Sequence, residues 1–326
     1  MIRLRPSALA APLIAAALFA PTTAVAGPHR YLVVPFENLS RERSLNWIGD
    51  ALALSLADRL ELLGMRTAGR GERLDALESL GLPDGKPLSL ASASRLAAAV
   101  RADRLVTGTF NYDPNVGVVV SGMLLDPRSV NQIWEGTHPG ALARILSLMD
   151  PLVLEAAAKD TSRLSPADPS TLGTFSDPPL TVYETLVKAL LEPEPERRLA
   201  ALQKALGMDR RSTAIRRAIA FEQFDGGRLA EALATLDGIA ADQCPDGWRL
   251  HLLRARILAA QGNLDAALQS LSKSIAAGDS ADAHLLLARL SSTRGETARA
   301  RAEIEIARGL DPGNPELASV GNVTPR

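Results

Sequence analysis

The chain has 326 residues, enough for two ordinary domains that each bury a core of their own. It carries 36 lysines and arginines against 37 aspartates and glutamates, a formal net charge of −1. This balance excludes an overall electrostatic field that would attract nucleic acid or an anionic membrane. Aromatic residues make up only 4% of the chain, which leaves few platforms for stacking bases or sugars.

Residues 1–26 have the three parts of a secretory signal peptide. Arg3 and Arg5 form a positively charged start, residues 8–20 are apolar, and residues 24–26 are Ala-Val-Ala before a glycine. The apolar run is shorter than the roughly 20 residues that span a bilayer. The only cysteine of the chain lies far downstream, and no later stretch is apolar and long enough to be a transmembrane helix. We therefore expect cleavage after residue 26, a location in the bacterial periplasm, and no lipoprotein anchor.

Residues 30–158 alternate between patterns typical of strands and of helices. The β-branched apolar run at 31–36 predicts a strand buried on both faces. From Trp47 to Leu63 large apolar residues recur every three or four positions, which predicts a helix that Gly64 ends. We expect the remaining elements to be a strand at 65–68, helices at 70–80 and 89–102, strands at 104–112, 116–125 and 130–134, and a helix at 141–158. This order predicts an α/β domain in which helices pack on a mixed sheet.

Four short segments of this half resemble the TolB N-terminal-like domains. They are Pro-Phe-Glu-Asn-Leu-Ser at 35–40, Trp-Ile-Gly at 47–49, Ala-Asp-Arg-Leu-Val-Thr-Gly-Thr at 102–109 and Leu-Asp at 125–126. The segments occur in the order of the family, and the resemblance covers roughly residues 30–136. It implies an envelope or periplasmic module without catalytic residues, often followed by tetratricopeptide repeats.

Three residues of this domain admit both a functional and a structural interpretation. Glu37 and Asn38 follow the first predicted strand and could face a partner, although a strand-to-helix loop needs polar side chains in any case. Gly108, within a predicted strand, indicates close packing or a bulge more readily than the approach of a ligand.

A linker and a set of repeats follow the first domain. Residues 159–179 contain four prolines among serine, threonine, aspartate and glycine, which predicts a boundary between domains. Beyond it Gly-Arg-Leu-Ala-Glu-Ala at 227–232 recurs as Gly-Asn-Leu-Asp-Ala-Ala at 262–267 and as Gly-Glu-Thr-Ala-Arg-Ala at 295–300. The first glycines of these motifs are 35 and 33 residues apart, close to the roughly 34-residue period of tetratricopeptide repeats.

The recurring glycine allows a tight turn between antiparallel helices, and the alanine five residues later lets the two helices approach closely. Residues 180–313 therefore resemble tetratricopeptide (TPR) repeats, and residues 314–326 are expected to be a flexible tail. The resemblance implies an all-α solenoid that binds extended peptides or helices on its concave face.

The first helix of each repeat is expected to line that concave groove. The residues predicted to face it are Arg217, Phe221, Phe224, Arg249, Leu252, Arg256, Leu285 and Arg289. Four arginines and two phenylalanines on one surface could hold carboxylates while gripping apolar side chains. The alternative is that these arginines only solvate an exposed helix face.

No arrangement of residues predicts catalysis, a cofactor or a bound metal. The four histidines, at positions 29, 138, 251 and 284, lack metal-ligand spacing. Ser270 and Lys273 match a Ser-x-x-Lys pattern, but no partner motif accompanies them. Cys244 lies in a predicted turn between repeats and is expected to be a simple free thiol rather than a cross-link to a partner.

These features together favour an exported, non-catalytic adaptor for protein–protein interaction. The alternative is a periplasmic sensor whose α/β domain binds a small molecule and whose repeats relay that state. A hydrolase would need a nucleophile and a base brought together, and the first domain offers only His138 and scattered acids. The identity of the partner and the oligomeric state stay open at this point.

Overall fold

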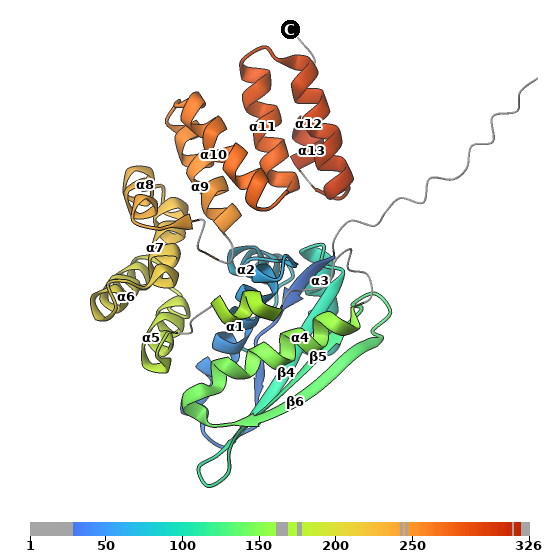
Figure 1. Ribbon diagram of the computed structural model, residues 1–326, viewed down its shortest axis with the longest axis vertical. Coiled ribbons are helices and arrows are strands. Elements are labelled where there is room, and N and C mark those ends of the chain that lie inside the picture. Colours follow the sequence, from blue (N-terminus) through green and yellow to red (C-terminus); the bar gives the residue numbers. More distant parts are fainter. Residues whose placement is uncertain are drawn as a thin grey trace, which may run out of the picture.

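The computed structural model describes residues 29–160, 169–174, 178–241, 244, 247–314 and 316–320. The predicted signal peptide and most of the predicted linker lie outside these residues. The chain forms a mixed sheet with helices, followed by paired helices in a TPR-like array (Figure 1), as the sequence predicts.

The sheet has the strand order β3-β1-β4-β5-β6, and β2 also pairs with β4. Its strands are β1 (Arg30–Val33), β2 (Glu37–Asn38), β3 (Arg66–Thr67), β4 (Arg104–Asp113), β5 (Gly117–Leu125) and β6 (Gln132–Gly140). The pairings of β1 with β3 and β4, and of β2 with β4, are parallel. The β4–β5 and β5–β6 pairings are antiparallel, so the sheet is mixed.

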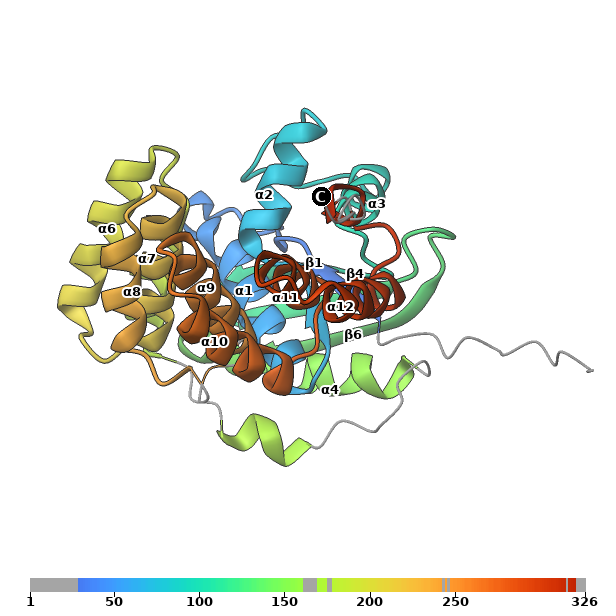
Figure 2. The same cartoon turned by 90° about the horizontal axis from the view of Figure 1, so that it is seen from above.

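Both faces of the sheet carry helices. The helices of this part are α1 (Trp47–Leu62), α2 (Arg70–Ser79), α3 (Leu90–Ala99) and α4 (Met149–Lys159), and a 3-10 segment at Leu142–Leu148 precedes α4. In Figure 2 α2 and α3 lie on the opposite side of the sheet from α4. Neighbouring residues of β4 point to opposite faces. Val106 therefore joins the core under α1 and α4, whereas Leu105 joins the core under α2 and α3.

Gly108 is required by close packing, as the sequence analysis favoured. A Cβ atom at this position would lie 2.2 Å from the Phe36 ring and 2.3 Å from the Ser121 carbonyl oxygen. Gly49 of α1 is in a similar position, because its Cβ would lie 2.2 Å from the carbonyl oxygen of Phe36. These two glycines let β4 and α1 approach the end of the first strand from different sides.

The remaining helices pack as consecutive antiparallel pairs. They are α5 (Leu180–Leu190), α6 (Pro195–Met208), α7 (Thr213–Asp225), α8 (Leu229–Asp237), α9 (Gly247–Ala260), α10 (Leu264–Ala277), α11 (Ala281–Thr293), α12 (Thr297–Leu310) and the short α13 (Glu316–Val320). The turn glycines Gly227, Gly262 and Gly295 have φ angles of +72°, +79° and +78°, a conformation that favours glycine. The alanines five residues after them, at positions 232, 267 and 300, are fully buried between paired helices.

Several segments differ from the expectations drawn from the sequence. Glu37 and Asn38, expected in a loop between strand and helix, form strand β2. Strand β6 runs to Gly140, well past the predicted end at Trp134, because it pairs along its length with β5. Residues 316–320, which the sequence analysis assigned to a flexible tail, form α13, and Val320 of this helix is buried in the cluster that contains Leu285 and Ile304.

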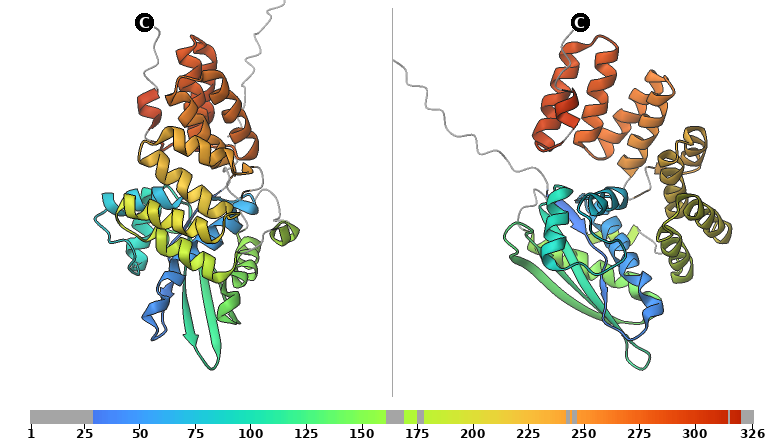
Figure 3. Two further views of the ribbon diagram at one scale, coloured as in Figure 1. Left: turned by 90° about the vertical axis from the view of Figure 1, so that its left-hand side faces the viewer. Right: turned by 180° about the vertical axis from the view of Figure 1, so that it is seen from behind.

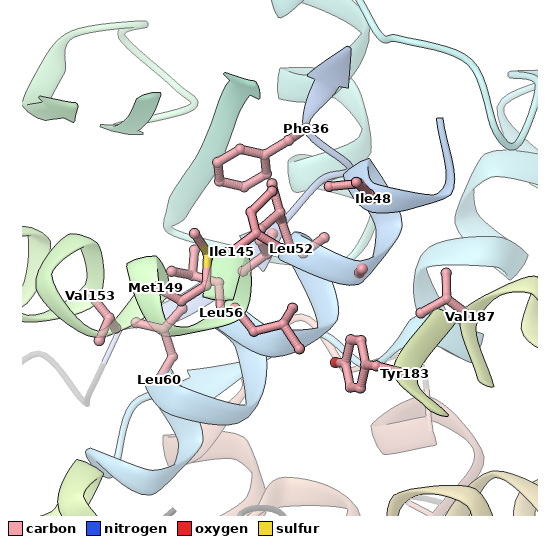
Figure 4. Packing of buried hydrophobic residues seen from close by; sticks show 14 of the residues in the cluster. Phe36, Ile48, Leu52, Leu56, Leu60, Ile145, Met149, Val153, Tyr183 and Val187 are labelled. Carbon is pink, nitrogen blue, oxygen red and sulfur yellow. The ribbon is translucent and has the colours of Figure 1, made fainter. Parts of the chain in front are cut away.

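The α/β part and the first repeats share one hydrophobic core. Tyr183 and Val187 of α5 belong to the same buried cluster as Leu52 and Leu56 of α1, and Figure 4 shows both α5 side chains beside α1. The sequence, by contrast, predicts two domains that each bury a core of their own on either side of a linker. The apolar stripe of α5 packs on α1 because no repeat precedes α5. The domain boundaries predicted from the sequence, at 30–158, 159–179 and 180–313, remain predictions. Among the described residues, no helix has both the length and the apolar character needed to cross a membrane.

Candidate protein-binding surface

The residues predicted to line the groove lie on three successive first helices of the repeats. Arg217 lies on α7, Arg249 and Arg256 lie on α9, and Arg289 lies on α11. The array curves around α1 and α2 of the α/β part (Figure 3), so these helices face the inside of the arc. The structure thus brings the four arginines onto consecutive inner helices.

The apolar members of the predicted set stabilise the array itself. Leu252 and Leu285 are 5% and 0% exposed and belong to clusters between the repeats. Phe221 and Phe224 are half-buried and pack against the cluster around Ala232 and Leu236. Since these side chains already pack against apolar neighbours, the arginines are the members of the predicted set best able to bind a partner.

Arg217 binds a carboxylate of the α/β part. Its Nη2 atom lies 3.1 Å from both Oδ1 and Oδ2 of Asp58, which projects from α1. Both side chains are 17% exposed, so the pair is largely removed from solvent. Charge-assisted hydrogen bonds in such surroundings are stronger than those between exposed groups.

Arg249 is part of a buried network around Glu61, near the end of α1. Glu61 Oε1 accepts hydrogen bonds from the Thr67 amide at 2.7 Å and the Thr67 hydroxyl at 2.8 Å, and it lies 3.1 Å from Arg249 Nη1. The other oxygen, Oε2, accepts from Trp248 Nε1 at 3.0 Å. Arg249 also donates to the Thr67 carbonyl oxygen. The Glu61 side chain is only 5% exposed, and these donors offset the cost of burying its charge.

The indole ring of Trp248 contacts two guanidinium groups. The Arg249 and Arg66 guanidinium carbons are 4.6 Å and 5.5 Å from the ring centroid. Burial lowers the pKa of Arg66 from its ordinary value, and the nearby carboxylates of Glu61 and Asp279 oppose that shift. Trp248 therefore joins cations from both parts of the chain at this contact.

Arg256 and Arg289, by contrast, remain accessible. Arg256 lies 3.7 Å from Asp282, and these side chains are 40% and 46% exposed. Arg289 lies 3.0 Å from Glu316 of α13, with side-chain exposures of 47% and 42%. The arginines thus divide into two that hold the α/β part and two that face solvent.

Sequence reasoning found the arginines of this surface but missed Asp58, Glu61 and Trp248. The register of the repeats locates the arginines, because the residues 13, 10 and 6 positions before a turn glycine face the inside of the array and the four arginines occupy such positions. The two carboxylates lie on the solvent side of the pattern that predicts α1, where acidic residues are expected on any helix. Nothing in the local sequence indicates that helices distant in the chain pack over Asp58 and Glu61.

The other residues considered for chemistry lie in structural contacts. The two nitrogens of His284 lie 2.6 Å from Asp279 and 2.5 Å from Glu303. His138 Nε2 lies 3.0 Å from Glu155 at the β6–α4 contact. Ser270 is buried in helix packing, and the Cys244 thiol is 3.6 Å from the Ala240 carbonyl oxygen. Within the described ranges no three histidine, cysteine, aspartate or glutamate side chains are grouped so that they could hold a metal ion.

Comparison with known proteins finds similarity of fold only. No protein-family model and no curated protein matches the chain. The LpoB C-terminal domain from Salmonella enterica is 18% identical, with 35% of this chain and 82% of that one covered and a TM-score of 0.30. Lipoprotein GNA1162 from Neisseria meningitidis is also 18% identical, with 41% and 99% covered and a TM-score of 0.31. MamA is 18% identical, with 42% and 81% covered and a TM-score of 0.39. The resemblance to TolB N-terminal-like domains remains an inference from the sequence.

Proposed function

We propose that the protein is a non-catalytic adaptor of the bacterial envelope whose helical array binds an acidic segment of another protein. One observation supports this proposal above the others. Arg217 and Arg249 on the inner helices already hold two carboxylates, Asp58 and Glu61, that lie three residues apart on α1. The inner surface of the array is therefore suited to carboxylates spaced by about one helical turn.

The accessible half of the same surface is the site proposed for the partner. Arg256 and Arg289 occupy equivalent positions in successive repeats. They are 33 residues apart, and the turn glycines that follow them, Gly262 and Gly295, are also 33 residues apart. Their present contacts with Asp282 and Glu316 are exposed pairs, which typically contribute only about 0–1 kcal/mol. A partner whose carboxylates are better placed can replace them at little cost.

The envelope location in this proposal rests on the sequence of residues 1–26 alone. Its charged start, apolar centre and small-residue exit are typical of export to the periplasm. An exported adaptor would meet its partner in the periplasm, where a groove of this kind can bind a segment of an envelope protein.

The proposal is tested by reversing the two accessible charges. In Arg256→Glu/Arg289→Glu we expect the Kd for a helical peptide carrying an aspartate and a glutamate three residues apart to rise at least tenfold, measured by fluorescence anisotropy. The matched control is Arg299→Glu/Arg308→Glu on α12, the second helix of its repeat, whose arginines are also exposed. Equal peptide affinity in the folded variant and the control would contradict the proposed groove.

A further inference from the structure

One face of the sheet is only partly covered. Leu105 and Leu125 lie under α2 and α3, whereas the same face farther along β4 and β5 carries Thr107, Thr109 and Ser121. Seen from behind, the long strands extend past α3 (Figure 3, right). This uncovered part of the sheet is separate from the arginine surface of the array.

A recess of about 190 Å³ lies at the edge of the covered region. Pro87 and Leu88, from the segment between α2 and α3, form one wall, and the sheet forms the floor. The rest of the lining includes Glu37, Thr107, Thr109, Ser121, Met123 and Glu135. Five stretches of the chain, at 34–37, 87–88, 107–109, 121–123 and 135, thus build one hollow.

The strand register arranges the floor in two rows. Glu37 is opposite Thr109, Thr109 is opposite Ser121, and Ser121 is opposite Thr137. The Ser121 and Thr137 hydroxyl groups are 2.9 Å apart. In the adjacent row Thr107 is opposite Met123, and Met123 is opposite Glu135. A floor of hydroxyl groups both donates and accepts hydrogen bonds, so it suits a polar chain laid across the strands.

Within the described part of the chain, the two carboxylates at the ends of this floor have no cationic partner. Among the described residues, no ion pair joins Glu37 or Glu135 to a lysine or arginine, and Glu135 accepts only from the neutral amide of Gln132 at 3.1 Å. Both side chains are exposed. Glu37 on β2 and Glu135 on β6 are three strand spacings apart and lie in adjacent rows, which corresponds to roughly 16 Å between their Cα atoms.

We propose that this recess binds an extended basic segment of a protein partner, with two lysines or arginines four residues apart that meet Glu37 and Glu135. In an extended chain residues i and i+4 point to the same side and are roughly 13 Å apart, and the long side chains of lysine and arginine span the remaining distance to the two carboxylates. Leu88 and Met123 offer apolar surface to the aliphatic stems of these side chains. The protein would then present a negative surface on the sheet and a positive surface on the array.

The test uses the full mature chain and a defined probe. The probe is an acetylated and amidated decapeptide of glycine and serine with two lysines four residues apart, titrated while amide NMR signals are followed. We expect the signals of Thr109, Ser121 and Met123 to shift, and the shifts to weaken as salt is added. Glu37→Gln/Glu135→Gln should raise the Kd at least tenfold, whereas Glu194→Gln, an exposed carboxylate at the start of α6, should not change it.

Three results would overturn the proposal. The first is a set of shifts confined to other elements, and the second is the same Kd in the double variant and in wild type. The third is a concentration-dependent increase in sedimentation coefficient that Glu37→Gln/Glu135→Gln abolishes, because it would assign the recess to a second copy of the chain. None of these results bears on the groove, since Arg256 and Arg289 lie on other elements and their test uses an acidic peptide.

Discussion

Glu61 joins α1, β3 and α9 through one carboxylate group. Its two oxygens accept from Thr67 and Trp248 and pair with Arg249, so all of its neighbours are donors. A neutral amide in place of this carboxylate would put its NH₂ group opposite another hydrogen-bond donor. Its side chain therefore matters for stability and for the orientation of the array relative to the sheet.

Replacing Glu61 with glutamine tests this role. The amide has the same shape, but it leaves the half-buried Arg249 without the charge of Glu61 and turns an NH₂ group toward a donor. We expect a loss of about 3–5 kcal/mol in the free energy of unfolding, measured by urea denaturation. Glu305→Gln, whose carboxylate pairs with the exposed Arg308, should stay within about 0.5 kcal/mol of wild type. A similar small change in both variants would show that the network around Glu61 contributes little.

At the scale of elements, the parts with strong periodicity were predictable. The TPR-like helices follow from a recurring glycine and alanine, because Gly262 must adopt a positive φ and Ala267 must fit between two helices. Strand β6 was predicted too short, since Gly136, Pro139 and Gly140 disfavour strands in isolation and only pairing with β5 holds them extended. The contacts of the arginines were not predictable, because they depend on how α1 packs against α5 and not on any local pattern.

Helix α13 closes the far end of the array. Val320 is 3% exposed, and Asn314, just before the helix, donates to Asp282 at 3.0 Å. A terminal repeat needs such a cover because its outer apolar surface has no neighbour. Truncation after Asn314 should lower the free energy of unfolding by about 1.5–3 kcal/mol and speed hydrogen exchange in α11. Truncation after Val320, which keeps α13, is the control; equal exchange in the two proteins would contradict the capping role.

At the scale of the molecule, the α/β part covers the near end of the array. Tyr183 and Val187 are 5% and 0% exposed in the core shared with α1. At the contact between the two parts Arg217 binds Asp58, and Arg249 binds Glu61. Burying one large apolar side chain contributes about 1.5–3 kcal/mol, so the shared core and the buried ion pairs together make separation of the two parts costly.

The contact between the α/β part and the array should hold the two parts together after the chain is cut. Limited proteolysis is expected to cut the predicted linker, between Lys159 and Pro179, because its proline-rich sequence has few apolar side chains to anchor it. The two fragments should nevertheless elute together in gel filtration, since the shared core, which also contains Leu172 of the predicted linker, still joins them. Glu61→Gln combined with Asp58→Asn should favour their separation, because both carboxylates that the array holds lose their charge. Fragments of the wild-type protein that elute apart would show instead that the two parts dock only weakly.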